Sequence, residues 1–152
     1  MKQKITNTPE ETKKFAQNFV RNLKGGEILG LVGDLGAGKT VFVQGLAKAL
    51  GVKEVVNSPT FVLMKIYEIS LTKGARPSTP NIIQRLVHID AYRLESFEQL
   101  KEIGIEEYLN QKDCVVAIEW ADKVSEIKQY PKYQEIIFKE GKSLEERVIC
   151  IQ

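Results

Sequence analysis

The sequence predicts an α/β fold whose central sheet is mainly parallel and flanked by helices. Two observations carry this prediction. Glu27 to Val32 is a strand-like segment that enters a glycine-rich turn, and the turn leads into a helical pattern at Val41 to Leu50. Cys114 to Glu119 is apolar almost throughout, which is typical of a strand covered on both faces. With 152 residues, we expect one domain spanning 1–152.

Local sequence signals predict helices and a strand in the N-terminal half of the chain. Thr8 to Glu11 is a capping box with proline at the first helical position, which predicts a helix to about Leu23. Gly25-Gly26 ends that helix, and Gly51 is the expected C-terminal cap of the helix that follows the glycine-rich turn. Phe61 to Ile69 has the composition of a strand.

The remaining elements follow the same kinds of signal. Residues 72–81 have the composition of an exposed loop. Ser96 to Gln99 is a second capping box, opening a helix that Gly104 breaks. The other expected elements are strands at Gln84 to Asp90, Glu135 to Lys139 and Arg147 to Ile151, with a turn near Gly141, and a short helix at Ile105 to Asn110.

Composition narrows the function classes. A net charge of +2 is too weak to argue for nucleic acid as a direct partner. No apolar run approaches the ~20 residues of a membrane span, and Met1 to Thr8 lacks a signal-peptide core. Cys114 and Cys150 have no metal-like or redox-like spacing, so we expect buried free thiols. These features favour a cytoplasmic protein without membrane contact.

Gly33 to Thr40 reads GDLGAGKT and satisfies the phosphate-binding loop pattern GxxxxGK[ST]. Its glycines let backbone N–H groups turn inward around phosphates, at the start of a helix that favours anions. We predict nucleoside triphosphate binding by this loop, rather than a glycine-rich turn without a ligand. The expected contacts are Gly33, Asp34, Leu35, Gly36, Ala37, Gly38, Lys39 and Thr40, with the Lys39 ammonium exposed to the ligand and the Thr40 hydroxyl on Mg²⁺.

Two acids stand where apolar strands end, and the carboxyl ends of parallel strands meet at one edge of a sheet. Glu119 is the candidate for the magnesium role, directly or through water. Asp90 is the candidate base or water-orienting residue, with metal contact also open. The alternative for each is an acid that caps a neighbouring helix. We expect both carboxylates to be open to solvent.

Four other residues deserve a hypothesis each. Ser58 and Thr60 flank Pro59 where nucleotide switches place a γ-phosphate sensor, although a simple loop is as well supported by spacing alone. His88, the only histidine, is either structural or part of the site. Trp120 follows Glu119 and is expected within reach of the nucleotide, although a lone Trp is often core or interface.

Five motifs in this order resemble the TsaE family, once called YjeE, over roughly residues 8–120. They are GDLGAGKT, SPTF (Ser58 to Phe61), HIDAYRL (His88 to Leu94), GIEEYL (Gly104 to Leu109) and VAIEW (Val116 to Trp120). The resemblance implies a P-loop NTPase fold with a parallel core sheet flanked by antiparallel strands. It also implies binding of ATP and Mg²⁺, with hydrolysis that is weak alone and faster on the TsaB–TsaD complex.

In that family, TsaD transfers a threonylcarbamoyl group to adenosine 37 of tRNAs that read codons beginning with A, and TsaE is thought to reset the assembly between turnovers. This makes tRNA an indirect partner. Carried over by motif, Thr40 and Glu119 hold magnesium, Asp90 is linked to hydrolysis, and Trp120 lies close to the site. Ser58 to Phe61 would be the switch-like segment, which makes its Thr60 the second catalytic candidate beside Asp90. The stretch from Tyr67 to Gln84 is longer than the family's usual link. The C-terminal hairpin of the family passes near the nucleotide, which makes Lys142 and Arg147 candidates.

Two other function classes share the phosphate loop. A nucleoside or small-molecule kinase normally carries an arginine-rich lid, whereas the five arginines here are scattered, at Arg21, Arg76, Arg85, Arg93 and Arg147. A nucleotide-dependent binding module without useful turnover would show slow hydrolysis that no partner stimulates.

Overall fold

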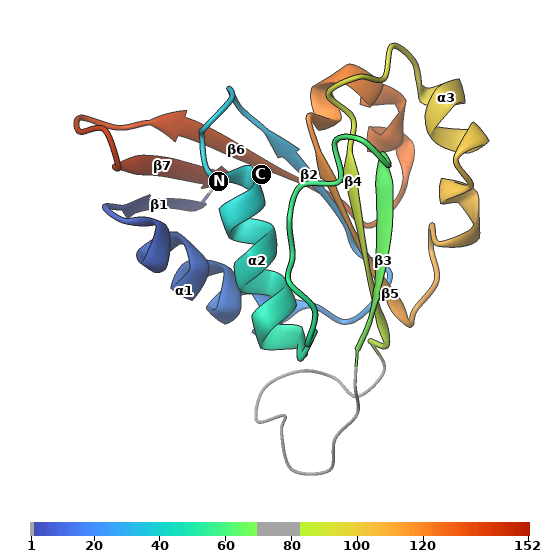
Figure 1. Ribbon diagram of the computed structural model, residues 1–152, viewed down its shortest axis with the longest axis horizontal. Helices are drawn as coiled ribbons and strands as arrows, with labels where there is room; N and C mark the ends of the chain where they lie inside the picture. The colour runs from blue at the N-terminus through green and yellow to red at the C-terminus, as the bar shows by residue number, and fades with distance from the viewer. Residues whose placement is uncertain (1, 70–82) are drawn as a thin grey trace.

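Seven strands form one sheet in the computed structural model, which describes residues 2–69 and 83–152 (Figure 1). The strand order is β1-β7-β6-β2-β5-β4-β3. The four central strands are parallel. At one edge β3 pairs antiparallel to β4, and at the other β7 pairs antiparallel to both β6 and β1. This confirms the expected parallel core with antiparallel flanks. The strands are β1 (Lys2–Thr6), β2 (Ile28–Val32), β3 (Met64–Glu68), β4 (Arg85–Asp90), β5 (Cys114–Glu119), β6 (Tyr133–Glu140) and β7 (Arg147–Ile151).

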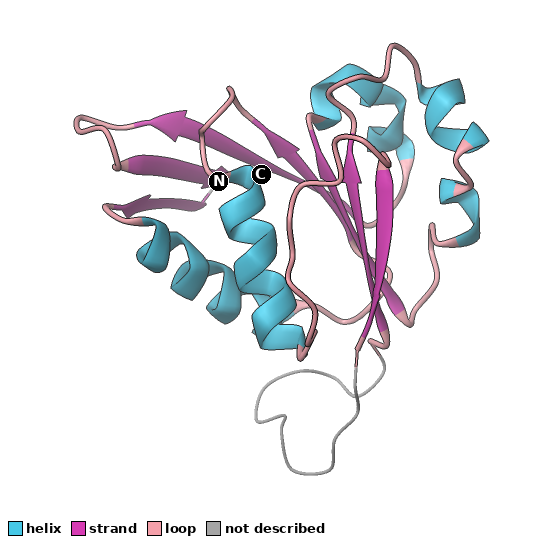
Figure 2. Ribbon diagram, viewed as in Figure 1, coloured by secondary structure: helices cyan, strands magenta, loops and turns pink. Residues whose placement is uncertain are grey.

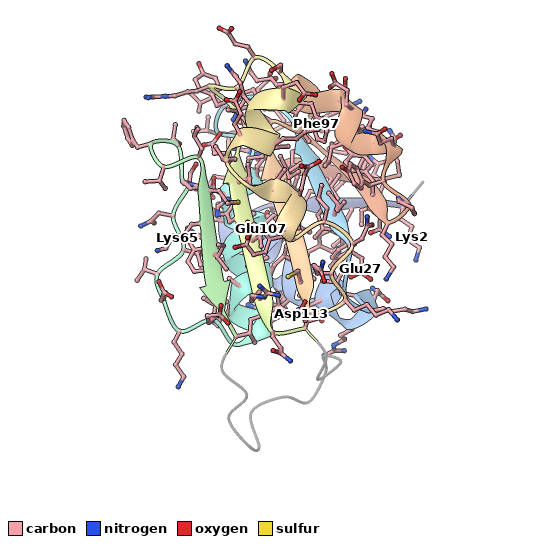
Figure 3. All side chains as sticks on the ribbon, turned by 90° about the vertical axis from the view of Figure 1, so that its right-hand side faces the viewer. Lys2, Glu27, Lys65, Phe97, Glu107 and Asp113 are labelled. Carbon is pink, nitrogen blue, oxygen red and sulfur yellow. The ribbon has the colours of Figure 1, made fainter. Side chains whose placement is uncertain are left out.

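Helices cover both faces of the sheet (Figure 2). One face carries α1 (Pro9–Phe19), its continuation η1 (Val20–Asn22) and α2 (Lys39–Leu50). The other carries α3 (Phe97–Glu102) and the 3₁₀ segments η2 (Ile105–Glu107) and η3 (Ala121–Gln129). Figure 3 looks onto this second layer, with labelled Phe97 and Glu107 in front of the sheet. No helix within the described residues is long and apolar enough to cross a membrane.

The alternation of side chains along β2 divides the core into two layers. Leu29 and Leu31 point to the α1–α2 side, where Phe42 of α2 is fully buried. Ile28 points to the α3–η3 side and packs with Ile118 of β5. Because every residue of β5 is buried, this strand is covered from both faces, as its apolar sequence predicted.

Local signals predicted the caps well and the element ends less well. The Thr8 hydroxyl accepts from the Glu11 N–H, and Gly51 caps α2 with a φ of 88°. The α-helical part of α1 ends at Phe19, and the turn to Asn22 is 3₁₀. β3 begins at Met64 instead of residue 61, because the Pro59 carbonyl accepts from the N–H groups of residues 62 and 63 and forms a turn.

Two elements were not expected from the sequence. The residues of β1 are mostly exposed and lack an apolar pattern, so this strand is defined by backbone pairing to β7. η3 turns directly after Trp120 and contains a kink at Val124. The loop predicted at 72–81 lies outside the described residues. The connection after Gly51 runs back beside α2 to the carboxyl end of the sheet, bringing residues 58–63 to that edge (Figure 1).

Candidate functional site

The glycine-rich loop joins β2 to the N-terminus of α2. Gly38 adopts a φ of 99° immediately before Lys39, the first residue of α2. Gly33 has a φ of 149°, and a Cβ there would lie 2.5 Å from the Phe138 carbonyl oxygen. The loop therefore needs glycine at position 33 for both conformation and space. Its geometry points the helix N-terminus into the site, as an anion-binding loop requires.

Lys39 is folded back onto this loop. Its Nζ donates to the carbonyl oxygens of Gly33 and Asp34 at 2.6 and 2.8 Å, and it lies 3.8 Å from the centre of the Trp120 ring. Only 4% of Lys39 is exposed in the ligand-free chain. Its contact with a nucleotide stays a prediction. Burial lowers the pKa of Lys39, opposed by the nearby charges of Glu119 and Asp90.

Thr40 and Glu119 meet across the site although they are 79 residues apart. The Thr40 hydroxyl lies 2.8 and 2.9 Å from the two carboxylate oxygens of Glu119. The contact arises because β5 lies next to β2, with Leu31 paired to Glu119 in the sheet register. The two residues predicted as magnesium ligands are therefore adjacent in the structure.

Asp90 ends β4 beside Glu119, since the two residues are register partners. Its Oδ2 accepts hydrogen bonds from the hydroxyls of Ser58 and Thr60, and its Oδ1 accepts from the Tyr92 N–H at 3.0 Å. Burial raises the pKa of the Asp90 carboxyl, but these three hydrogen bonds outweigh it and leave the pKa below its ordinary value.

Neither acid is open to solvent, contrary to expectation. Asp90 is 4% exposed and Glu119 is 3% exposed. The physical reason is that hydroxyl groups cover both carboxylates: those of Ser58 and Thr60 on Asp90 and that of Thr40 on Glu119. Both acids are thereby kept as hydrogen-bond acceptors close to the phosphate loop.

His88 and Trp120 both contact the residues of the site. His88 is fully buried, and its Nε2 lies 2.8 Å from Glu119 Oε1. Trp120 has a φ of 59°, which is uncommon for a non-glycine residue, and this conformation starts η3. Its ring packs on Tyr92 and covers Lys39.

Arg147, a candidate for contact with the nucleotide, contacts the phosphate loop in the ligand-free chain. Its Nη2 donates to the Gly36 carbonyl at 2.9 Å, and its Nη1 donates to two carbonyls of the β6–β7 turn. The C-terminal hairpin therefore holds the tip of the phosphate loop. For Lys142, the described hydrogen bond is that of its backbone N–H to Glu146.

These residues line a hollow of about 360 Å³. Its lining is Leu35, Gly36, Ala37, Gly38, Lys39, Thr40, Val41, Ser58, Thr60, Asp90, Tyr92, Glu119 and Trp120. A larger hollow of about 760 Å³ lies between α1 and β7, away from these residues. The side-chain carboxylate of Glu27 in its lining already accepts from the N–H groups of Lys24 and Gly25. The smaller hollow is therefore the better candidate for chemistry.

The donor set fits Mg²⁺ bound together with a phosphate-bearing ligand. Magnesium prefers oxygen and is usually held by one or two protein groups plus substrate phosphates. The hydroxyl of Thr40 and the carboxylate of Glu119 supply two such oxygens. Within residues 2–69 and 83–152, no group of three or more His, Cys, Asp or Glu side chains could hold a metal by itself.

A family model described as "Threonylcarbamoyl adenosine biosynthesis protein TsaE" matches residues 6–149. The chain belongs to the TsaE family. It is 38% identical over 136 residues to the tRNA threonylcarbamoyladenosine biosynthesis protein TsaE of Bacillus subtilis (strain 168), covering 90% of this chain and 77% of that protein. With TsaE of Aquifex aeolicus (strain VF5) the identity is 39% over 125 residues, or 81% of this chain and 79% of that protein.

A solved structure supports the same assignment. The crystal structure of Bacillus subtilis YdiB superimposes with a TM-score of 0.71 at 32% sequence identity, covering 97% of this chain and 82% of that one. The fold is therefore that of a P-loop protein of the TsaE family, a family of tRNA modification. The sequence resemblance is confirmed, and it extends past residue 120 into the C-terminal hairpin.

Proposed function

We propose that this chain is a magnesium-dependent ATPase that acts on a TsaB–TsaD assembly during formation of the threonylcarbamoyl group on adenosine 37 of tRNA. The proposal includes a cytoplasmic location and a single P-loop ATPase domain over residues 1–152. The observation that carries it is the meeting of Thr40, Glu119 and Asp90 beside the phosphate loop. Family membership supports the pathway.

Each group of the site has a role in this proposal. Backbone N–H groups of residues 33–40 cradle the phosphates, and Lys39 leaves its loop carbonyls to contact the β- and γ-phosphates. Thr40 and Glu119 would hold Mg²⁺, which would neutralise charge on the phosphates. Asp90 orients the attacking water. Trp120 lies beside the nucleotide.

The hydrogen bond between Thr60 and Asp90 supports a gated mechanism, in which a rearrangement must precede hydrolysis. The Thr60 hydroxyl donates to Asp90, so it must turn away from that carboxylate before it can sense a γ-phosphate. Ser58 bonds both Thr60 and Asp90 and therefore moves with this segment. We propose that a partner surface brings about this rearrangement, as ordered switch segments do in other phosphoryl-transfer proteins.

Exposed apolar side chains near the site support a docking partner. Leu35 at the tip of the phosphate loop is 84% exposed, and Phe61 next to Thr60 is 86% exposed. Val62 and Tyr92 are also exposed. Apolar groups that cluster on a surface mark interaction sites more often than chance positions do. A partner covering Phe61 would act directly on Thr60.

The test is steady-state ATP hydrolysis by the chain alone, with TsaB–TsaD, and with Thr60→Ala. We expect a slow basal rate that the partner raises by ~10³-fold or more, by analogy with other gated phosphoryl transfer, and that Thr60→Ala stays slow. A rate of ~10 s⁻¹ without partner, unchanged by Thr60→Ala, would refute the gating. Slow hydrolysis that the partner leaves unchanged would favour a binding module.

A comparison of two variants distinguishes the proposed roles of Asp90 and Glu119. Asp90→Ala should keep nucleotide affinity and lose hydrolysis, because a water-orienting group acts mainly in the transition state. Glu119→Ala should also weaken the dependence of binding on Mg²⁺. If both variants lost this dependence equally while Asp90→Ala hydrolysed normally, the division of roles would be wrong.

A further inference from the structure

His88 is the chain's only histidine, and it sits under the proposed magnesium site. It lies on β4, two residues before Asp90, and is fully buried. Its Nε2 is 2.8 Å from Oε1 of Glu119 on the neighbouring strand. The proposed roles of the phosphate loop, Thr60, Asp90 and Glu119 make no use of this imidazole.

The hydrogen of the imidazole can be assigned from its neighbour. An ionised carboxylate only accepts hydrogen bonds, so Nε2 of His88 must be the donor to Glu119. The other ring nitrogen, Nδ1, is buried and has no hydrogen-bond partner within the described part of the chain. A buried polar atom without a partner costs stability. An apolar side chain would fill this position at lower cost, so packing alone does not explain the imidazole.

We propose that His88 is a positioning residue that fixes the Glu119 carboxylate for Mg²⁺, an inference that rests on the proposed function. The only side-chain donors to Glu119 within the described residues are Thr40 and His88. The hydroxyl of Thr40 has a single hydrogen, and its oxygen would itself bind the metal. The N–H of His88 comes from a central strand and holds Oε1 in place independently of the phosphate loop.

Loss of this support should weaken metal binding specifically. Glu119 is long and flexible, and without His88 its carboxylate keeps one donor, on a loop-proximal residue that must rearrange with the ligand. Hydrogen-bond partners of a metal ligand typically contribute about 10–100-fold in metal affinity or activity. Nucleotide binding without metal depends on the loop N–H groups and Lys39, so it should be nearly unaffected.

The side chains of glutamine and asparagine give a matched pair of variants. The amide nitrogen of glutamine is as many bonds from Cα as Nε2 of histidine, so His88→Gln can still donate to Glu119. The amide of asparagine corresponds to Nδ1 and falls short. Both variants replace the ring by an amide of the same polarity.

The affinity for a non-hydrolysable ATP analogue is measured with EDTA and again with Mg²⁺. We expect His88→Asn to lose about tenfold or more of the gain from Mg²⁺, with metal-free affinity within about twofold of the parent chain, and His88→Gln to retain most of the gain. In a Glu119→Ala background, His88→Asn should have no further effect. Equal gains in the two single variants, or parallel loss of metal-free affinity, would overturn the inference. If the parent chain itself failed to bind the analogue, the proposed function would fail instead.

A second measurement needs no substitution. Because there is one histidine, the imidazole ¹⁵N signals of the intact chain are unambiguous. We expect hydrogen on Nε2 in the ligand-free protein. Hydrogen on Nδ1 alone would place a lone pair against the carboxylate and would overturn the inference even if the His88 variants did not fold.

Discussion

At the scale of single residues, hydrogen bonds favour the charged form of Asp90. Asp90 is nearly fully buried, which favours its neutral form, yet donors on both of its oxygens favour the carboxylate. Removing one of these hydrogen-bond donors should therefore change the pKa of Asp90. Thr60 is the informative position because valine has nearly the same shape without the hydroxyl.

Thr60→Val should raise the pKa of Asp90 toward its unfolded value, lower stability near neutral pH and flatten the dependence of stability on pH. A carboxyl whose pKa is lower in the folded state adds stability above its unfolded pKa of about 3.9. That contribution is lost as the pH falls through the lower folded pKa. In Thr60→Val the difference between the two pKa values shrinks, so less stability depends on pH. Urea denaturation between about pH 3 and 7 measures this, with Thr60→Ser as the control. Coinciding profiles for the two variants would contradict the role of the hydroxyl.

At the scale of elements, the C-terminal hairpin supports the phosphate loop. Arg147, the first residue of β7, joins the β6–β7 turn to the Gly36 carbonyl, 111 residues away in sequence. Within the described residues, no side chain of the phosphate loop itself donates to the Gly36 carbonyl. The hairpin therefore limits the motion of the loop tip in the ligand-free chain.

Arg147→Met should weaken binding of ATP about three- to tenfold, since a partly exposed charged hydrogen bond contributes roughly 1 kcal/mol. Stability should change by less than about 1 kcal/mol, as for most surface substitutions. Arg21→Met is the control, because it removes the same charge from an exposed position of η1, away from the loop. Equal losses in both variants, measured by calorimetry, would mean that only net charge matters.

The sequence predicted the helices and strands that have local signals, and it missed those that form only through contacts with distant segments of the chain. The caps at Thr8 and Ser96 and the phosphate loop are encoded within a few residues each, and they were found. β1 has no apolar pattern and forms because β7 presents an unpaired edge. The stacking of Lys39 under Trp120 joins residues 81 positions apart, so no spacing rule indicates it.

The sequence predicted which residues form the candidate site, but not how deeply they are buried or what they contact. Thr40, Asp90 and Glu119 were selected from their places at strand ends and at the loop, and they do converge. Their burial was missed because the covering groups come from other segments of the chain. The link between His88 and Glu119 depends on which strands are neighbours, and strand order cannot be read from local patterns.

At the scale of the whole molecule, ligand binding should stabilise the fold as one unit. ATP with Mg²⁺ at about 100 times its Kd adds roughly 2.7 kcal/mol. For a chain of this size, that raises the unfolding temperature by about 5–10 °C. Lys39→Ala should remain folded and show little of this shift, because the phosphates lose their cationic partner. Lys48→Ala, an exposed lysine on the same helix, should behave like the parent chain. Affinity of Lys39→Ala within threefold of the parent would contradict the phosphate-loop assignment.

The place of β5 in the sheet has a consequence for folding. β5 is inserted between β2 and β4, so Glu119 reaches Thr40 and His88 only after two parallel pairings between distant segments have formed. Such non-local pairings form late, because closing the long intervening loops costs entropy before the pairings stabilise the chain. A partly folded chain can contain the complete GDLGAGKT segment and still lack a magnesium site. Binding of the metal-bound nucleotide therefore selects chains in which the central strands have finished assembling.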